Sequence, residues 1–235
     1  MYITPETKIL VLTGAGISAE SGLQTFRDPG GLWDRFDWRE LATPEAFAKK
    51  PGLVWDFYLE RRRLIKEAQP SPAHRALAKL ERYLDEGCFT LISQNVDNLH
   101  ERAGSMNMTK IHGSAMLDRC TKCGYRSQAQ KVYDRFPPIC PECESVLRPD
   151  VVWFGEELNS EHLKLAMQRL LECDLFIVIG TAGNVFPISQ FVYETQADKI
   201  YIGVEEPENA DAFQKVMLGK AGVILPELIN EYCEV

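Results

Sequence analysis

The feature that most constrains the fold is a short apolar run followed at once by a glycine-rich turn. Residues 8–13 (KILVLT) predict a buried parallel strand, and the turn after them, residues 14–22, reads GAGISAESG. Gly14, Gly16 and Ala19 have the G-x-G-x-x-G/A spacing of dinucleotide-phosphate turns. Such glycines let the backbone approach a pyrophosphate, and the next helix begins with free N–H groups. On this stretch alone, a tight turn without a ligand stays an open alternative.

The composition is ordinary for a globular protein. The 235 residues suffice for one or two domains, and 45% of them are hydrophobic. A formal net charge of −8 argues against a general affinity for nucleic acid. No apolar run approaches the ~20 residues of a membrane-spanning helix, and the first residues lack a signal-peptide pattern. We therefore expect a cytoplasmic protein without nucleic-acid or membrane partners, and the sequence indicates no oligomeric state.

Four of the seven cysteines form two C-x-x-C pairs. Cys120 and Cys123 are separated from Cys140 and Cys143 by sixteen residues, which is the spacing of Cys₄ zinc sites. Four thiolates fill a tetrahedral shell and leave no position for water, so we expect one structural Zn²⁺. Disulfides are the alternative, and they are uncommon inside cells. The other cysteines, at positions 88, 173 and 233, are expected to be buried or incidental thiols.

Helical and strand patterns alternate along the rest of the chain, which predicts an α/β fold with a parallel sheet. We expect helices over 43–68 with a break at Pro51, over 71–83, over 160–173 and from Leu225 onward, and strands at 89–92, at 175–179, at 199–204 and just before residues 110–113. No acidic residue ends a second strand about 20 residues after the glycines, which argues against an ordinary dehydrogenase.

Polar residues gather where the expected strands end. Gln94, Asn95 and Asp97 follow the strand at 89–92, and ligands of open α/β sheets bind at such ends. Their amides and carboxylate could hold ribose hydroxyls and a carboxamide, although a simple helix cap would also explain each of them. His112 ends another strand before a glycine and is the best general-base candidate among the four histidines.

Two other segments could close a ligand site. Residues 23–33 contain proline and glycines that predict a loop, and their aromatic residues suit either a lid or local packing. Tyr58, Arg61 and Arg62 share one face of an expected helix. The arginine run 61–63 is either a solvated charged face or part of an anion pocket, in which a guanidinium and a phenol hold a carboxylate.

Taken together, these residues resemble the sirtuin family of NAD-dependent protein deacylases. The resemblance extends from Ile9 to about Ile229, and it is carried by residues 14–27, by 94–97 with 112–113, by the four paired cysteines, and by 151–156 (VVWFGE) with 180–181. It implies a Rossmann-like domain made of 1–33, 71–113 and 151–235. It also implies a smaller domain made of a helical insertion, 34–70, and a zinc-binding insertion, 114–150. NAD and an acylated lysine of an extended peptide would meet between them.

The resemblance assigns a role to each site residue. His112 is the general base on the ribose hydroxyls, Asn95 orients ribose and water, and Asp97 holds the nicotinamide carboxamide. NAD is consumed, and nicotinamide and 2′-O-acyl-ADP-ribose are released. Further cofactor contacts are implied for Gly14, Ala15, Gly16, Ser18, Phe26, Arg27, Gln94, Gly180, Thr181 and Ala221. The peptide is expected to bind as an added strand between Val152, Trp153, Phe154 and Gly155 on one side and residues 183–185 on the other.

Departures from the common family pattern point to the acyl group. Thr25 stands where many deacetylases have an aspartate, and Tyr58, Arg61 and Ala42 match the members that remove acidic acyl groups. We therefore expect a desuccinylase and demalonylase with weaker deacetylase activity. We expect Arg62 and Arg63 to belong to a solvated, charged helix face.

Two further departures concern the expected NAD contacts. Ala182 replaces a serine, which removes a hydroxyl near the NAD phosphates. Gly203 replaces the asparagine that the family uses for the adenosine ribose, and Glu205 is a candidate substitute. Plain deacetylation or mono-ADP-ribosyl transfer is the alternative activity. A non-catalytic NAD sensor or zinc-ribbon interaction module is a further alternative. His112 argues against it, because binding alone does not need a base at the ribose.

Overall fold

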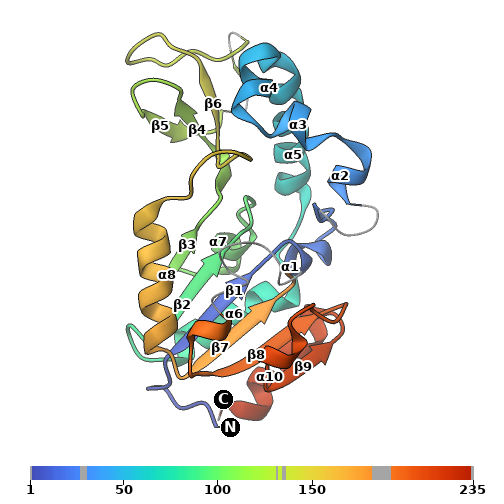
Figure 1. Ribbon diagram of the computed structural model, residues 1–235, viewed down its shortest axis with the longest axis vertical. Coiled ribbons are helices and arrows are strands. Elements are labelled where there is room, and N and C mark those ends of the chain that lie inside the picture. The colour runs from blue at the N-terminus through green and yellow to red at the C-terminus, as the bar shows by residue number, and fades with distance from the viewer. Residues whose placement is uncertain (1, 27–30, 131, 134–135, 182–191, 234–235) are drawn as a thin grey trace.

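The computed structural model describes residues 2–26, 31–130, 132–133, 136–181 and 192–233, which form two lobes (Figure 1). The larger lobe is built on a six-stranded sheet, and the smaller one on a three-stranded sheet with helices beside it. Of the helices in these ranges, none combines the length and hydrophobicity needed to cross a bilayer.

The large sheet is parallel throughout and has the strand order β3-β2-β1-β7-β8-β9. Its strands are β1 (Ile9–Thr13), β2 (Phe89–Ser93), β3 (Met108–Lys110), β7 (Leu175–Ile179), β8 (Asp198–Gly203) and β9 (Lys215–Leu218). The chain moves outward from β1 to β3, returns to the centre at β7 and moves outward again on the other side. This is the Rossmann order, and ligands bind at its switch point between β1 and β7. The expected α/β fold is confirmed, whereas the edge strand β9 was not expected.

Helices cover both faces of the large sheet. Alternate residues of β1 point to opposite faces. Ile9 and Val11 pack with α6 (Pro72–Tyr83) and α10 (Ala221–Tyr232), whereas Leu10 and Leu12 pack with α8 (Ser160–Glu172). The shorter helices α1 (Gly16–Ala19) and α7 (Leu99–Ala103) and the 3₁₀ turn η1 (Ala210–Ala212) follow β1, β2 and β8 respectively. The closing helix begins at Ala221, four residues before the start expected from the sequence.

The small lobe is made of two insertions into the large one. The first contains α2 (Leu32–Arg35), α3 (Trp38–Leu41), α4 (Pro44–Lys49) and α5 (Pro51–Glu67), and the second contains β4 (Gly113–Cys120), β5 (Arg126–Gln128) and β6 (Leu147–Val151). The helix break expected at Pro51 is confirmed. The two insertions share one apolar core, and the Trp55 indole N–H donates to Leu147 O across it at 3.2 Å.

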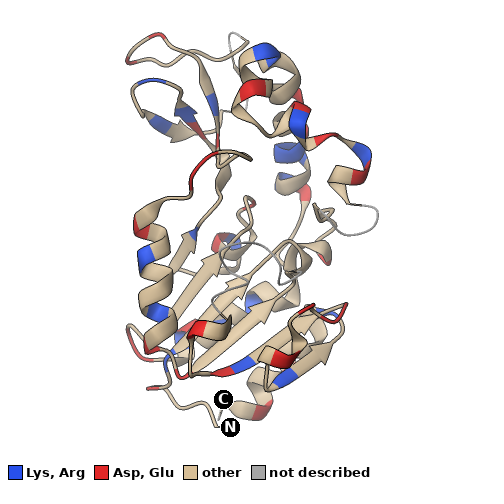
Figure 2. Cartoon of the chain, in the orientation of Figure 1, with Lys and Arg blue, Asp and Glu red and all other residues tan. Residues whose placement is uncertain are grey.

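The expectation that Arg62 belongs to a solvated face is wrong. Its side chain is 2% exposed and forms an ion pair of 2.6 Å with Asp118 of β4. It also donates to Tyr133 Oη at 2.6 Å and to the carbonyl of Ala115 at 2.6 Å. Arg63 fits the expectation, because it is exposed and pairs with acidic residues one turn away. Figure 2 shows basic and acidic residues interspersed over both lobes.

Candidate active site

A cavity of about 760 Å³ lies where the ends of β1, β2 and β7 face the small lobe. The site residues expected from the sequence that line it are Gly14, Ala15, Gly16, Phe26, Ala42, Tyr58, Arg61, Gln94, Asn95, His112, Val152, Trp153, Phe154, Gly155, Gly180 and Thr181. Ser18 and Asp97 are buried just behind this wall. Arg27 and residues 182–185 lie outside the described ranges. The described residues of 14–26, 94–97, 112, 152–155 and 180–181 are thus brought to one place, whereas Ala221 is not among the residues that line the cavity.

The two glycine turns pack against each other at the switch point. A β-carbon on Gly14 would lie 2.6 Å from Gly180 O, and one on Gly16 would lie 2.7 Å from Gly180 Cα. Gly180 has a φ of +59°, and a β-carbon there would lie 2.5 Å from Ile17 N. Close approach of two backbones therefore requires these glycines even before a ligand is considered. Helix α1 has one turn only, and the N–H groups of residues 16–18 already donate within the protein.

Ser18, Asn95 and Asp97 form a hydrogen-bonded group that joins the ends of β1 and β2. The Ser18 hydroxyl donates to Asp97 Oδ2 at 2.9 Å, and the Asn95 amide donates to Ser18 Oγ at 3.2 Å and to Gly14 O at 3.0 Å. Asp97 Oδ1 accepts the N–H of Leu99 at 3.0 Å. These bonds fix the orientation of Asn95 on the cavity wall before any ligand arrives.

His112 lies on the cavity wall two residues after β3. Its Nδ1 lies 2.9 Å from Gln94 O. Because a carbonyl only accepts, Nδ1 carries the proton of the neutral ring and Nε2 carries the lone pair. The His112 carbonyl accepts the N–H of Val152 at 2.9 Å, so the histidine and the segment 152–155 are tied together. An imidazole held in this tautomer is suited to act as a general base.

The small lobe contributes Tyr58 and Arg61 from adjacent turns of α5, 4% and 5% exposed respectively. Burial raises the pKa of Tyr58 to about 12, so the phenol keeps its proton at neutral pH. Arg61 Nη2 donates to Gln24 O at 3.2 Å, and the guanidinium lies over the Phe26 ring. Burial lowers the pKa of Arg61, and the charge of Asp97 opposes that shift. Its Nε and Nη1 are buried with no partner in the described residues.

Comparison with known proteins identifies the family. A family model described as "Sir2 family" matches residues 14–187. The chain belongs to the Sir2 family. An NAD-dependent protein deacylase of Leptospira interrogans is 45% identical over 229 residues, which cover 95% of this chain and 92% of the relative. NAD-dependent protein deacylase 2 of Pyrobaculum aerophilum is 46% identical over 94% of this chain and 90% of its own length.

Solved Sir2 structures agree with this assignment. A Sir2 homologue–NAD complex, 42% identical, superposes with a TM-score of 0.87 and covers 97% of this chain and 90% of that one. A Sir2–p53 peptide–NAD⁺ complex, 27% identical, has a TM-score of 0.82 and covers 95% of this chain and 92% of that one. The expected family and the expected NAD cosubstrate are thereby confirmed.

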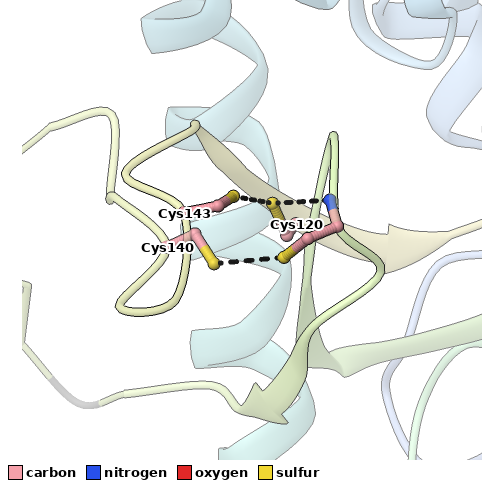
Figure 3. A group of neighbouring side chains, drawn as sticks. Cys120, Cys140 and Cys143 are labelled. Atoms are coloured by element: carbon pink, nitrogen blue, oxygen red, sulfur yellow. Dashed lines mark hydrogen bonds between the residues drawn. The ribbon is translucent and has the colours of Figure 1, made fainter.

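The Sir2 chain also brings its four paired cysteines together in the small lobe, and Figure 3 labels three of them, Cys120, Cys140 and Cys143. All four sulfur atoms lie within 4.8 Å of one another, with Cys120 Sγ 3.4 Å from Cys143 Sγ and Cys123 Sγ 3.6 Å from Cys140 Sγ. A tetrahedral zinc with Zn–S bonds of about 2.3 Å requires sulfur separations of about 3.8 Å. The donor set therefore fits one structural zinc, whereas no disulfide is formed among these cysteines.

Sequence reasoning missed the residues that hold the VVWFGE segment of this Sir2 protein. Glu156 accepts the N–H of Trp153 at 2.8 Å and pairs with Arg148 at 2.6 Å and with Arg119 at 2.8 Å. Burial raises the pKa of Glu156, but the hydrogen bonds from Arg148 and Trp153 outweigh it and lower that pKa overall. The sequence did contain a signal for this pair: Arg148 precedes the segment, and Glu156, of opposite charge, ends it.

Gly203 stands where the common family pattern has an asparagine, and it packs against Tyr201 of the same strand. A β-carbon on Gly203 would lie 2.4 Å from the hydroxyl of Tyr201, which donates to Thr181 O at 3.1 Å. A larger side chain at this position would therefore require Tyr201 to move. Glu205 is exposed. Ala221 is the first residue of α10, beside the N–H of Gly222, which donates to Glu20 Oε1 at 2.7 Å.

Proposed function

We propose that this Sir2-family protein, an NAD-dependent protein deacylase, removes acidic acyl groups such as succinyl and malonyl from protein lysines faster than it removes acetyl. Nicotinamide and 2′-O-acyl-ADP-ribose are the other products, and the reaction takes place in the cytoplasm. The observation that carries the proposal is the buried Arg61 guanidinium, whose Nε and Nη1 have no partner in the described residues.

A buried charge without partners is costly, and proteins keep such groups where a ligand supplies the partner. Arg61 lines the cavity together with Tyr58 and Ala42. A carboxylate at the end of a succinyl chain can accept from a guanidinium N–H and from the Tyr58 hydroxyl, and such charge-assisted bonds are strong. Ala42, with its small side chain, leaves space for the longer acyl group. An acetyl group has no carboxylate, so Arg61 gives it no comparable interaction.

The catalytic roles that the resemblance implies are part of the proposal, and the geometry of the cavity supports them. Bound NAD would supply the ADP-ribose that accepts the acyl group. His112 Nε2 would take a proton from a ribose hydroxyl, and its neutral tautomer is set by Gln94 O. Asn95 is held by Ser18 and Gly14 in one orientation, so it could position the ribose or the attacking water. Asp97, behind the wall, would hold the carboxamide edge of nicotinamide.

The substrate peptide is proposed to lie along Val152–Gly155. Three N–H groups of this segment already donate within the protein: Val152 to His112 O, Trp153 to Glu156 and Phe154 to Ala42 O. Main-chain pairing with a peptide would therefore rely on carbonyls of the segment. Recognition through the main chain gives modest sequence preference, which suits an enzyme acting on many protein lysines.

The test is one peptide prepared with an acetyl, a succinyl or a malonyl group and incubated with NAD, with products read by mass spectrometry. We expect kcat/KM for succinyl to exceed that for acetyl by at least about tenfold, and Arg61→Met to lower the succinyl value about 10- to 100-fold while sparing acetyl. Arg63→Met, one position along on the exposed face, should change neither. His112→Ala should lower turnover of every acyl group about 10²- to 10⁴-fold.

Equal turnover of acetyl and succinyl peptides by the parent protein would overturn the acidic-acyl proposal and leave plain deacetylation. ADP-ribose found covalently attached to protein, in place of O-acyl-ADP-ribose, would instead identify a transferase.

A further inference from the structure

A hydrogen bond between side chains joins the VVWFGE segment to the acyl end of the cavity. Trp153 Nε1 lies 2.9 Å from the Tyr58 hydroxyl oxygen, and both side chains are buried. An indole N–H can only donate, so the phenol oxygen is the acceptor. The hydroxyl proton of Tyr58 must then point elsewhere, and no acceptor for it is found within the described ranges.

Trp153 is held both at its main chain and at its indole ring. The Trp153 main-chain N–H donates to Glu156, the Arg148 guanidinium carbon lies 3.2 Å from the ring centroid, and the Phe47 ring lies 5.3 Å away. Arg148 is fixed in turn by its pair with Glu156 and by a 2.7 Å bond from Nη2 to Val151 O. The indole is thus a rigid donor, and it has little freedom to follow Tyr58 if the phenol moves.

We propose that Trp153 is a positioning residue for acyl-group selection: its indole N–H occupies the acceptor side of the Tyr58 hydroxyl and so keeps that hydroxyl as a donor toward the acyl carboxylate. The inference rests on the proposed acidic-acyl function and deepens it. It also means that the segment 152–155, which is proposed to bind the peptide, orients the Tyr58 hydroxyl, which is proposed to bind the acyl carboxylate. Without the indole N–H, the phenol can rotate and present a lone pair to the carboxylate, which repels it.

The decisive variant is Trp153→Phe, which keeps an aromatic ring and removes the N–H. We expect KM for the succinyl peptide to rise about 5- to 10-fold with kcat little changed, the loss of one hydrogen bond. The acetyl peptide has no carboxylate to lose, so its kcat/KM should fall less than that of the succinyl peptide, and the succinyl-to-acetyl ratio should drop. Tyr58→Phe should have at least as large an effect on the succinyl peptide.

The double variant separates positioning from general structural support. If Trp153 acts through Tyr58, then Trp153→Phe adds no further loss of succinyl preference in a Tyr58→Phe background. Trp55→Phe is the matched control, because it also removes a buried indole donor of the small lobe, the one that bonds Leu147 O. It should leave the succinyl-to-acetyl ratio at the parental value.

A spectroscopic readout checks the hydrogen bond independently of turnover. The indole ¹⁵N–¹H signal of Trp153, assigned through Trp153→Phe, should shift in Tyr58→Phe and stay in place in Arg63→Met. The inference is overturned if that signal does not move, if Trp153→Phe keeps the parental acyl preference, or if the double variant loses the sum of both single effects.

Failure of the proposed function has a different signature. In that case the parent itself shows no succinyl preference, and Tyr58→Phe changes nothing. A parent with a preference that depends on Tyr58 but survives Trp153→Phe contradicts the inference about Trp153 alone.

Discussion

The two lobes face the same cavity but are stabilised in different ways. The large lobe is a parallel sheet whose two faces are covered by apolar residues of helices, with β1 buried along its whole length. The two insertions of the small lobe share one apolar core, and the buried Arg62–Asp118 pair crosses from one insertion to the other. The second insertion is further tied by its four cysteines and by the pair between Arg148 and Glu156. The small lobe therefore adds buried charge and metal ligation to apolar burial, on which the large lobe mainly depends.

The difference also appears at the cavity walls. On the large-lobe side, Ser18, Asn95 and Asp97 are hydrogen-bonded to one another. On the small-lobe side, Arg61 keeps buried N–H groups without partners in the described part of the chain. Because the polar groups of the large-lobe wall are hydrogen-bonded within the protein, their orientation does not depend on the ligand, which suits a ligand that is always the same. Under the proposed function, the acyl carboxylate would supply the missing partner of Arg61, and acyl specificity could then change on this wall without disturbing the opposite one.

The largest predicted effect comes from removing zinc. Cys143→Ser, or a strong chelator, should unfold the small lobe and leave much of the large-lobe sheet intact, because structural zinc supplies folding energy directly. All four tryptophans, at positions 33, 38, 55 and 153, lie in the small lobe or at the cavity. When zinc is lost, tryptophan fluorescence should therefore change strongly, whereas the far-ultraviolet circular dichroism of the sheet should change little.

The control for the zinc experiment is Cys88→Ser, because Cys88 lies beside β2 in the large lobe and far from the metal ligands along the chain. It should retain a full equivalent of zinc. If Cys143→Ser also retained zinc and parental fluorescence, the proposed dependence of the small lobe on the metal would be wrong.

The second effect concerns the buried ion pair. Arg62→Met leaves the Asp118 carboxylate buried beside Tyr133, and loss of one partner of such a pair costs about 3–5 kcal/mol. For a chain of this size we expect the melting temperature to fall by about 10 °C. Adding Asp118→Asn to Arg62→Met removes the uncompensated charge and should recover part of the loss. If the double variant melts below both single variants, the pair is not the source of the stability.

The same ion pair shows where sequence reasoning stops. The glycine turn, the C-x-x-C pairs and the capped helices were predictable because their signals are local. Arg62 and Asp118 are 56 positions apart, and Trp153 and Tyr58 are 95 apart. Arg61 and Arg62 are neighbours on one helix, yet only the packing of β4 against α5 decides which of them finds a carboxylate. The sequence could place both arginines on a helix but could not tell a structural arginine from a ligand-binding one.

A smaller effect is a dependence of the free energy of unfolding on pH, which arises from a buried histidine of the large lobe. His74 is fully buried, its ring centroid lies 4.7 Å from that of His100, and its Nδ1 accepts the N–H of Ser71. Burial lowers the pKa of His74 to about 4, whereas the unfolded chain has a value near 6.5. The unfolded state therefore binds more protons between these values. Stability should fall by about 3 kcal/mol as the pH drops from 6.5 to 4.

His74→Gln tests the pH effect while keeping the local structure. Glutamine at this position can still accept from the Ser71 N–H in a capping box, but it does not titrate. Urea unfolding at several pH values should show a shallower loss of stability in the variant. An unchanged slope would mean that other groups cause the acid sensitivity.

The smallest expected change is in the stability of Arg61→Met, and it separates the two arginines most directly. Removing Arg61 takes away a buried guanidinium whose Nε and Nη1 have no partner in the described residues, together with one 3.2 Å bond from Nη2 to Gln24 O. The desolvation cost of the charge should roughly cancel the lost bond, so we expect stability to stay the same or to rise by about 1 kcal/mol. Urea unfolding of Arg61→Met beside Arg62→Met measures the contrast. A loss as large as that of Arg62→Met would show that Arg61 is a structural residue. Unchanged stability together with lost succinyl turnover would show that its charge is kept for the substrate.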